Sequence, residues 1–161
     1  MQEQDGQRQQ PEALWFLDAR LTVRLRRAGG SDGISLLEFE AAQGHGPPLH
    51  VHRTEDEVFH VLEGMLRVQV GGRELRLGAG EAMRAPRGVP HTFLVESAAG
   101  ARWLIITSGG DFEAFVLGFA RPAEGPGLPP DQGPPTPAQQ EALAAACLRH
   151  DIELVGPPLQ P

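Results

Sequence analysis

The chain has 161 residues, which is the length of one domain and enough to bury a hydrophobic core. Its formal net charge of −7 argues against a general nucleic-acid binder, because such proteins carry a basic surface. The 20 glycines and 15 prolines indicate many tight turns, as all-β folds with short strands need, and an irregular tail. We therefore expect a single domain rich in β-structure.

The N-terminal residues 1–12 are low in apolar content, and we expect a disordered tip there. The segment contains no apolar run, so we expect no signal peptide. No other stretch reaches the continuous apolar length of a membrane helix, and the cytoplasm is the expected location. Cys147 is the only cysteine, so an internal disulfide is excluded, and its alanine-rich surroundings indicate a small buried side chain.

A barrel domain is expected over residues 13–120. From Leu14 to Thr107, short runs rich in Val, Leu, Ile and Phe are separated by turn residues, which is typical of β-strands. Glu63-Gly64 and Gly71-Gly72 are expected to be hairpin turns. Because long helices do not alternate with these strands, the pattern predicts a sandwich or closed barrel rather than a parallel α/β sheet.

Helices are expected only after the strands. Asp111 is a candidate cap for a short helix over 111–119. One face of that helix is apolar and would pack on the barrel exterior or on a partner subunit; it contains Phe112, Phe115, Val116 and Phe119.

Residues 121–161 are expected to form a proline-rich connector and a C-terminal helix packed on the barrel. The six prolines and three glycines of 121–135 favour an extended connector. Thr136 to Gln139 reads as a capping box with proline at the first helical position. The helix would run to about His150 and dock through Leu143, Ala146 and Cys147.

The chemically informative residues are three histidines and a glutamate. His50 and His52 alternate across Val51, so both imidazoles face the same side of a strand. Glu57 adds a carboxylate, and His91 would have to come from another strand. Histidine nitrogens with a carboxylate and open positions suit a metal ion that binds water, dioxygen or a substrate.

The spacing around these residues resembles the first signature of the cupin superfamily, G-x5-H-x-H-x3,4-E-x6-G. Its five defined positions are occupied by Gly44, His50, His52, Glu57 and Gly64. The second signature, G-x5-P-x-G-x2-H-x3-N, is met at all but one position. The matching residues are Gly80, Pro86, Gly88 and His91, whereas Val95 stands in place of asparagine.

The resemblance implies an all-β double-stranded β-helix, a jelly-roll-like barrel that holds one divalent metal ion through His50, His52, Glu57 and His91. The same nitrogen and oxygen ligands serve Fe, Ni, Mn, Co, Zn and Cu, so the identity of the metal stays open. The resemblance also implies a homodimer, for which exposed sheet edges give a physical motive. A cupin that keeps the barrel without the metal is the competing interpretation.

Strand alternation extends the site. If Glu57 and His91 face inward, Phe59, Phe93 and Val95 do too, and they would form an apolar wall for an aromatic or otherwise flat substrate. The same side chains could instead fill a small barrel. Other nearby polar residues are not expected to bind the metal. Glu55 and Asp56 are expected to be solvated loop charges, and the histidines outside the motifs are His45, His60 and His150.

Within the superfamily, the chain resembles bacterial single-domain cupins related to quercetin 2,3-dioxygenase. The similar segments are PPLHVHRTEDEVFHVLEG, APRGVPHTF, the proline-rich connector and HDIELVGPPL. This implies a metal-dependent dioxygenase that opens the ring of a flavonol or similar enol substrate with O2, with Glu57 as ligand and general base. The alternatives are a non-catalytic protein that binds or senses a small molecule, and a metal-dependent isomerase or epimerase.

Overall fold

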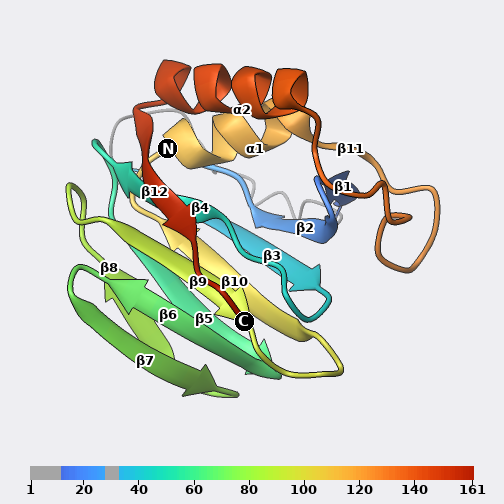
Figure 1. Cartoon of the computed structure of the whole chain (residues 1–161), viewed down its shortest axis with the longest axis horizontal. Coiled ribbons are helices and arrows are strands. Elements are labelled where there is room, and N and C mark those ends of the chain that lie inside the picture. The colour runs from blue at the N-terminus through green and yellow to red at the C-terminus, as the bar shows by residue number, and fades with distance from the viewer. Residues whose placement is uncertain (1–11, 28–32) are drawn as a thin grey trace, which may run out of the picture.

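The computed structural model describes residues 12–27 and 33–161, and within them two antiparallel sheets enclose the hydrophobic core (Figure 1). The two helices of this described part lie together at one end of the sheets. This arrangement confirms the expected all-β barrel with a short helix after it and a C-terminal helix. Residues 1–11, most of the expected disordered tip, lie outside the described residues, and Glu12 is the first residue of a strand.

The described strands are divided between a larger and a smaller sheet. The larger has the order β11 (Arg121–Pro122), β1 (Glu12–Phe16), β2 (Ala19–Leu25), β3 (Ser35–Ala41), β10 (Ala101–Thr107), β5 (Glu57–Glu63) and β8 (Ala82–Ala85). The smaller has the order β12 (Ile152–Pro158), β4 (Pro48–His52), β9 (His91–Val95), β6 (Met65–Val70) and β7 (Arg73–Gly78).

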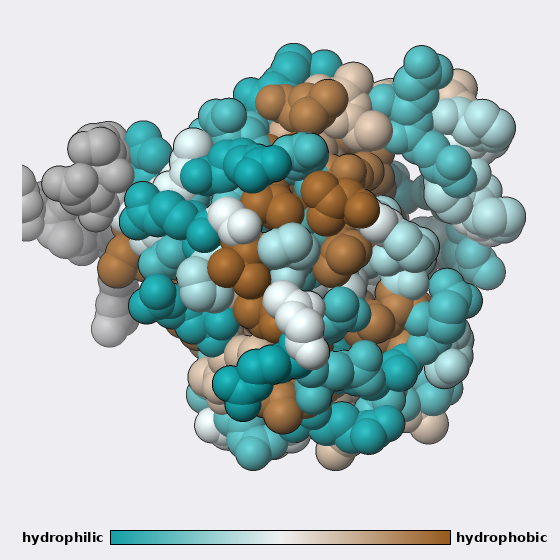
Figure 2. All heavy atoms as spheres, turned by 60° about the vertical axis from the view of Figure 1, so that its left-hand side comes forward, coloured by the Kyte–Doolittle hydropathy of each residue, from teal (hydrophilic) through white to brown (hydrophobic). Residues whose placement is uncertain are grey.

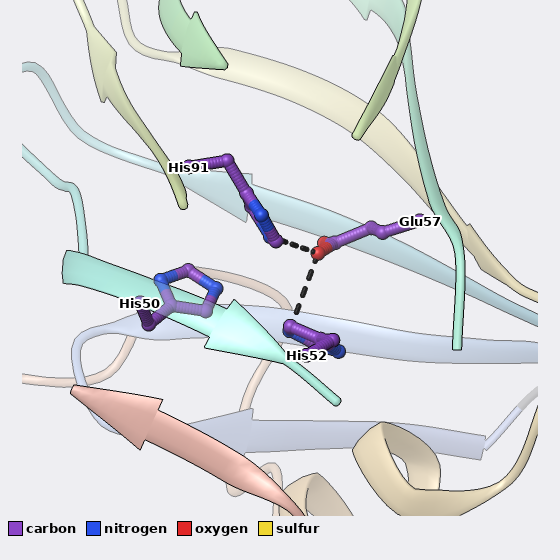
Figure 3. A group of neighbouring side chains, drawn as sticks. All are labelled: His50, His52, Glu57 and His91. Carbon is purple, nitrogen blue, oxygen red and sulfur yellow. Dashed lines mark hydrogen bonds and ion pairs between the residues drawn. The ribbon is translucent and has the colours of Figure 1, made fainter. Parts of the chain in front are cut away.

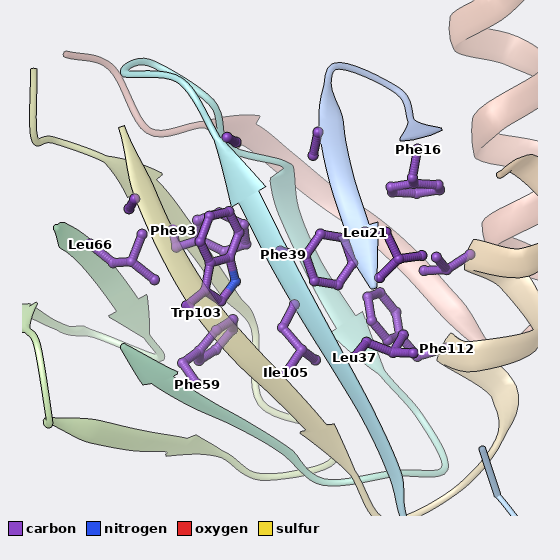
Figure 4. Close-up of a cluster of buried hydrophobic side chains, with 14 of the residues drawn as sticks. Phe16, Leu21, Leu37, Phe39, Phe59, Leu66, Phe93, Trp103, Ile105 and Phe112 are labelled. Atoms are coloured by element: carbon purple, nitrogen blue, oxygen red, sulfur yellow. The ribbon is translucent and has the colours of Figure 1, made fainter. Parts of the chain in front are cut away.

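Aromatic side chains from both sheets meet in the core (Figure 4). Trp103 of β10 stacks on Phe39 of β3, with ring centroids 5.8 Å apart. Phe93 of β9 meets the same indole edge-on from the smaller sheet, at 5.2 Å. Since alternate residues of β3, β5 and β10 are buried, each strand turns one apolar face inward, as a closed barrel requires.

One of the two expected hairpins is confirmed and the other is wrong. Gly71 and Gly72 join β6 to β7, with Val70 paired to Arg73 across the turn. Glu63-Gly64 instead connects β5 of the larger sheet to β6 of the smaller one. Gly64 has a φ of 80°, and a Cβ there would lie 2.5 Å from the Gly100 carbonyl oxygen, so glycine permits a close approach of two chain segments.

Helix α1 (Asp111–Phe119) lies at one end of the sheets and packs buried side chains against the core. The helix begins at Asp111 after Gly110, so Asp111 lies in the first turn and is not the cap that we expected. Phe112 and Phe115 are buried and belong to the main core, and Phe112 lies 6.3 Å from Phe39 between ring centroids. Phe112, Phe115 and Val116 of the predicted face therefore pack on the core at the barrel end, whereas Phe119 is 37% exposed.

Helix α2 (Pro137–Arg149) starts with the expected capping box, in which Thr136 and Gln139 exchange side-chain and backbone hydrogen bonds. Ala146 and Cys147 are buried, and Leu143 packs against the core, as expected. The strand after the helix, β12, was not expected. It pairs with β4 and so continues the smaller sheet beside the histidine strand. The division of the chain at residues 120 and 121 stays a prediction.

The surface mixes polar and apolar side chains. On the face drawn in Figure 2, hydrophobic residues lie among hydrophilic ones. Exposed large hydrophobic side chains in the C-terminal elements include Leu148 of α2 and Val155 of β12. Neither helix of the described chain is long and apolar enough to cross a membrane.

Candidate metal centre

Strand β4 presents two imidazoles to the end of the barrel near α1. His50 and His52 lie two residues apart on the strand and are buried. In the antiparallel pairing of β4 with β9, His50 lies opposite His91, and their ring centroids are 4.4 Å apart. Sheet register therefore brings together histidines that are far apart in the sequence.

The fourth group, Glu57, arrives from the other sheet as the first residue of β5. Figure 3 shows the four side chains pointing toward one another. Glu57 Oε2 lies 2.8 Å from His91 Nε2 and 3.3 Å from His52 Nε2. One candidate ligand atom from each of the four residues lies within 4.8 Å of the other three. The structure thus places the predicted ligands together, and their binding of an ion stays a prediction.

The outward-facing nitrogens of the histidines have fixed partners. His50 Nδ1 lies 2.8 Å from the Pro48 carbonyl oxygen, and His91 Nδ1 lies 2.9 Å from that of Val89. A carbonyl oxygen only accepts hydrogen bonds, so each Nδ1 carries the proton and donates it. In the neutral ring the lone pair is then on Nε2, which is the nitrogen that faces the centre of the cluster.

Burial and charge act on the cluster in opposite directions. Burial lowers the pKa of His50 to about 3, helped by the neighbouring charge of His91. Burial alone would raise the pKa of Glu57, but the charge of His52 and the hydrogen bond from His91 hold it at about 2. Burial likewise opposes a charge on His91, yet the hydrogen bond and charge of Glu57 outweigh it and raise the pKa of His91. Glu57 is therefore an anion and His50 a neutral imidazole at neutral pH.

These residues fit a transition-metal ion. His52 Nε2 is buried and lies 3.3 Å from Glu57 Oε2, but it makes no hydrogen bond within the described part of the chain. A buried polar nitrogen without a hydrogen-bond partner is unfavourable, and a metal ion bound to the neutral imidazole would remove that cost. Three imidazoles and a carboxylate are ligands for Fe, Ni, Mn, Co, Zn or Cu ions.

The predicted substrate wall lies deeper in the barrel. Phe59, Phe93 and Val95 are buried. The Phe59 ring lies 6.1 Å from the His91 ring and 5.6 Å from that of Phe93, measured between centroids. Phe93 also packs on Trp103, so these rings fill barrel volume close to the cluster. Whether they also contact a substrate stays a prediction.

Glu55 is the site residue that the sequence did not reveal. The expectation of a solvated loop charge was wrong, because Glu55 is 1% exposed. Its Oε1 accepts a hydrogen bond from the Phe112 amide at 2.6 Å and lies 3.3 Å from His52 Nδ1. Its position three residues after His52 was the one available signal. Asp56, by contrast, lies near the surface beside Arg84 and Arg87.

The remaining histidines lie outside the four-residue cluster. His45 interacts with Asp18 at 2.8 Å in the loop after β3. His60 is on β5 but its side chain points the opposite way to that of Glu57, since it lies three positions further along the strand. His150 is the C-cap of α2.

Comparisons with known proteins agree with this geometry. A family model described as a cupin domain matches residues 37–107. Quercetin 2,3-dioxygenase of Bacillus subtilis (strain 168) is 29% identical over 84 residues, which are 51% of this chain and 25% of that protein. The chain therefore matches about a quarter of the length of this relative.

Two solved structures are similar over most of their length. An RmlC-like cupin from Shewanella frigidimarina NCIMB 400 aligns with a TM-score of 0.55 at 24% identity, covering 71% of this chain and 97% of the other. The polyketide cyclase RemF from Streptomyces resistomycificus aligns with a TM-score of 0.50 at 26% identity, covering 66% of this chain and 79% of the other.

Proposed function

Because the chain belongs to the cupin superfamily, we propose that it is a metal-dependent dioxygenase that opens the ring of a flavonol or similar enol substrate with O2. The observation that carries the proposal is the buried cluster of His50, His52, Glu57 and His91. The likeness to the Bacillus quercetin 2,3-dioxygenase supports this type of reaction.

In this proposal the three histidines hold the ion through Nε2, and Glu57 is the fourth ligand. A bound divalent ion supplies Lewis acidity to the enol oxygen of the substrate and a site for O2. Glu57 is held ionised by its histidine neighbours, and in this proposal the carboxylate oxygen that does not bind the ion would accept the enol proton of a substrate bound beside it.

The surroundings of the cluster favour a flat apolar substrate. Phe59, Phe93 and Val95 are packed in the barrel core close to the cluster, and their side chains have no hydrogen-bond donors or acceptors for sugar hydroxyl groups. A sugar isomerase or epimerase needs such groups around its substrate, whereas an aromatic ring system packs on apolar side chains. The apolar surroundings therefore favour the dioxygenase over the isomerase or epimerase.

Anaerobic binding of quercetin followed by exposure to O2 tests the proposal, on protein whose metal content has been measured. We expect a shift of the flavonol absorption on binding, then O2 consumption and CO release. Binding without turnover would instead support a protein that binds or senses a small molecule. A product formed without O2 would point to an isomerase or cyclase reaction, and the similarity to a polyketide cyclase makes this outcome worth measuring.

We also propose that the protein is a cytoplasmic homodimer. Leu148 is 65% and Val155 43% exposed, and β12 and β7 are the outer strands of the smaller sheet. Exposed apolar side chains and unpaired strand edges favour association with a second copy. Light scattering coupled to size-exclusion chromatography would give twice the chain mass of 17.3 kDa for the dimer.

A further inference from the structure

Glu55 connects helix α1 to the metal centre. Its carboxylate lies on the Nδ1 side of His52, opposite the Nε2 atom that faces Glu57. The same oxygen, Oε1, accepts the hydrogen bond from the Phe112 amide in the first turn of α1. Glu55 therefore contacts a candidate ligand without itself belonging to the four-residue cluster.

His52 differs from the other two histidines in what its outer nitrogen contacts. His50 and His91 donate from Nδ1 to neutral backbone carbonyl groups. His52 instead faces a carboxylate, which is a stronger acceptor when ionised. A carboxylate on the outer nitrogen fixes the tautomer and the orientation of a metal-binding imidazole and increases the basicity of its inner nitrogen.

The segment that contains Glu55 is joined to the start of α1 by several contacts. Gly110 precedes the helix and offers no side-chain cap, so Glu55 satisfies an amide that would otherwise lack a partner. Thr54 Oγ1 donates a hydrogen bond to the Asp111 carboxylate. The Asp56 amide donates to Ser108 Oγ at 2.9 Å, next to these contacts.

Gly109 makes the close approach of Glu55 sterically feasible. A Cβ at this position would lie 2.7 Å from Glu55 Oε2 and 3.1 Å from Glu55 Cβ. Any other residue would push the carboxylate away from its present place. The Phe112 ring also packs on His52, with centroids 5.4 Å apart, so α1 supports the imidazole from a second direction.

We propose that Glu55 is a positioning residue of the metal centre, which holds His52 with Nε2 inward and couples its donor strength to the docking of α1. The inference rests on the metal centre of the proposed function, but it does not depend on which reaction occurs there. A purely structural cap would need only a hydrogen-bond acceptor for the Phe112 amide, whereas this role also requires a negative charge next to His52 Nδ1.

Binding of Co²⁺ measures this difference, because its visible absorption bands report the ligand geometry. The variant Glu55→Gln keeps an oxygen acceptor for the Phe112 amide but removes the charge. We expect its dissociation constant for Co²⁺, measured by chelator competition, to rise roughly 10- to 100-fold and its absorption bands to shift. The control Asp56→Asn removes one charge at the adjacent, partly exposed position and should bind Co²⁺ like the unmodified chain.

A second variant guards against an effect of Glu55→Gln on folding. Gly109→Ala leaves every charge in place but displaces the carboxylate, so it should shift the Co²⁺ bands too. Unchanged affinity and spectra in both variants would overturn the positioning role. If the unmodified chain binds no Co²⁺, the metal centre and this inference fail together. The dioxygenase alone would be rejected if the unmodified chain binds Co²⁺, both variants change that binding as expected, and the protein with its natural metal reacts with no enol.

Discussion

Oε2 of Glu57 and Nε2 of His91 are 2.8 Å apart, and their hydrogen bond joins the two sheets at the metal end of the barrel. Both atoms are the ones that would face an ion, so the chain's own contacts already assemble the cluster. Preassembly reduces the ordering that ion binding must impose, because the side chains are fixed by the sheets. The ion would replace the proton that the pair now shares.

Removal of the metal is expected to lower thermal stability. If the ion binds only the folded chain, a free ion concentration a thousand times the dissociation constant adds about 4 kcal/mol to the free energy of unfolding. This corresponds to a rise on the order of 10 °C in Tm. Differential scanning fluorimetry before and after chelation measures the change. His91→Gln should lose the response, and His60→Gln should keep it because His60 faces away from the cluster. The prediction would be contradicted if the chelated protein had the same Tm as protein whose bound metal had been confirmed by elemental analysis.

Phe59 is expected to be essential for stability. Its ring is 0% exposed and contacts both Phe93 and His91, so Phe59→Ala should cost about 3–5 kcal/mol in free energy of unfolding. Phe119→Ala is the control, because that side chain is 37% exposed and should cost less. Urea denaturation measures both. If Phe59→Ala keeps full stability and only weakens substrate binding, the side chain lines a cavity instead of filling the core.

Gly64→Ala is expected to destabilise the connection between the sheets by about 2 kcal/mol or more, since both a positive φ and a close backbone contact oppose a side chain. Gly72→Ala is the matched control, because a Cβ there would have no neighbour within 4 Å. The two unfolding curves should differ in midpoint but have similar slopes. Equal stabilities would show that the Gly100 segment moves away without cost.

The four clustered residues were predictable because each occupies a fixed position in a spaced pattern. His50 and His52 share a face by strand alternation, and the second signature adds His91 from a strand that pairs with theirs. Such patterns depend only on spacing along the chain, so they can be recognised without knowledge of the packing.

Other features depended on contacts between distant segments. Glu55 is buried by a helix 57 residues further along the chain, and apart from its position three residues after His52 nothing in the neighbouring sequence indicates this. The strand β12 contains Gly156 and ends in two prolines, and its pairing with β4 has register shifts, so it lacks the alternation that identifies strands. The Glu63-Gly64 turn was misassigned because glycine suits a tight hairpin and a close crossing between sheets equally well.

Cys147 is expected to resist thiol reagents as long as α2 is docked. It is 4% exposed, and burial raises the pKa of its thiol to about 11, above the usual 9.0. Since only the thiolate reacts, this pKa lowers its population at pH 8 about 100-fold, and lack of access slows labelling further. Between pH 9 and 11 the unfolded chain loses this proton while the folded chain keeps it, so the contribution of this thiol to stability falls as the pH rises through that window.

Labelling with a chromogenic disulfide at pH 8 measures the reactivity of Cys147, with the urea-unfolded chain as the reference for full access. A double variant, Cys147→Ser with Leu148→Cys, moves the thiol by one position to a side chain that is 65% exposed in the unmodified chain. That variant should react at nearly the rate of the unfolded chain, whereas the natural thiol should react at least about 100-fold more slowly. Equal rates for both thiols in native buffer would mean that α2 leaves the barrel in solution, and with it the packing that places β12 beside the histidine strand.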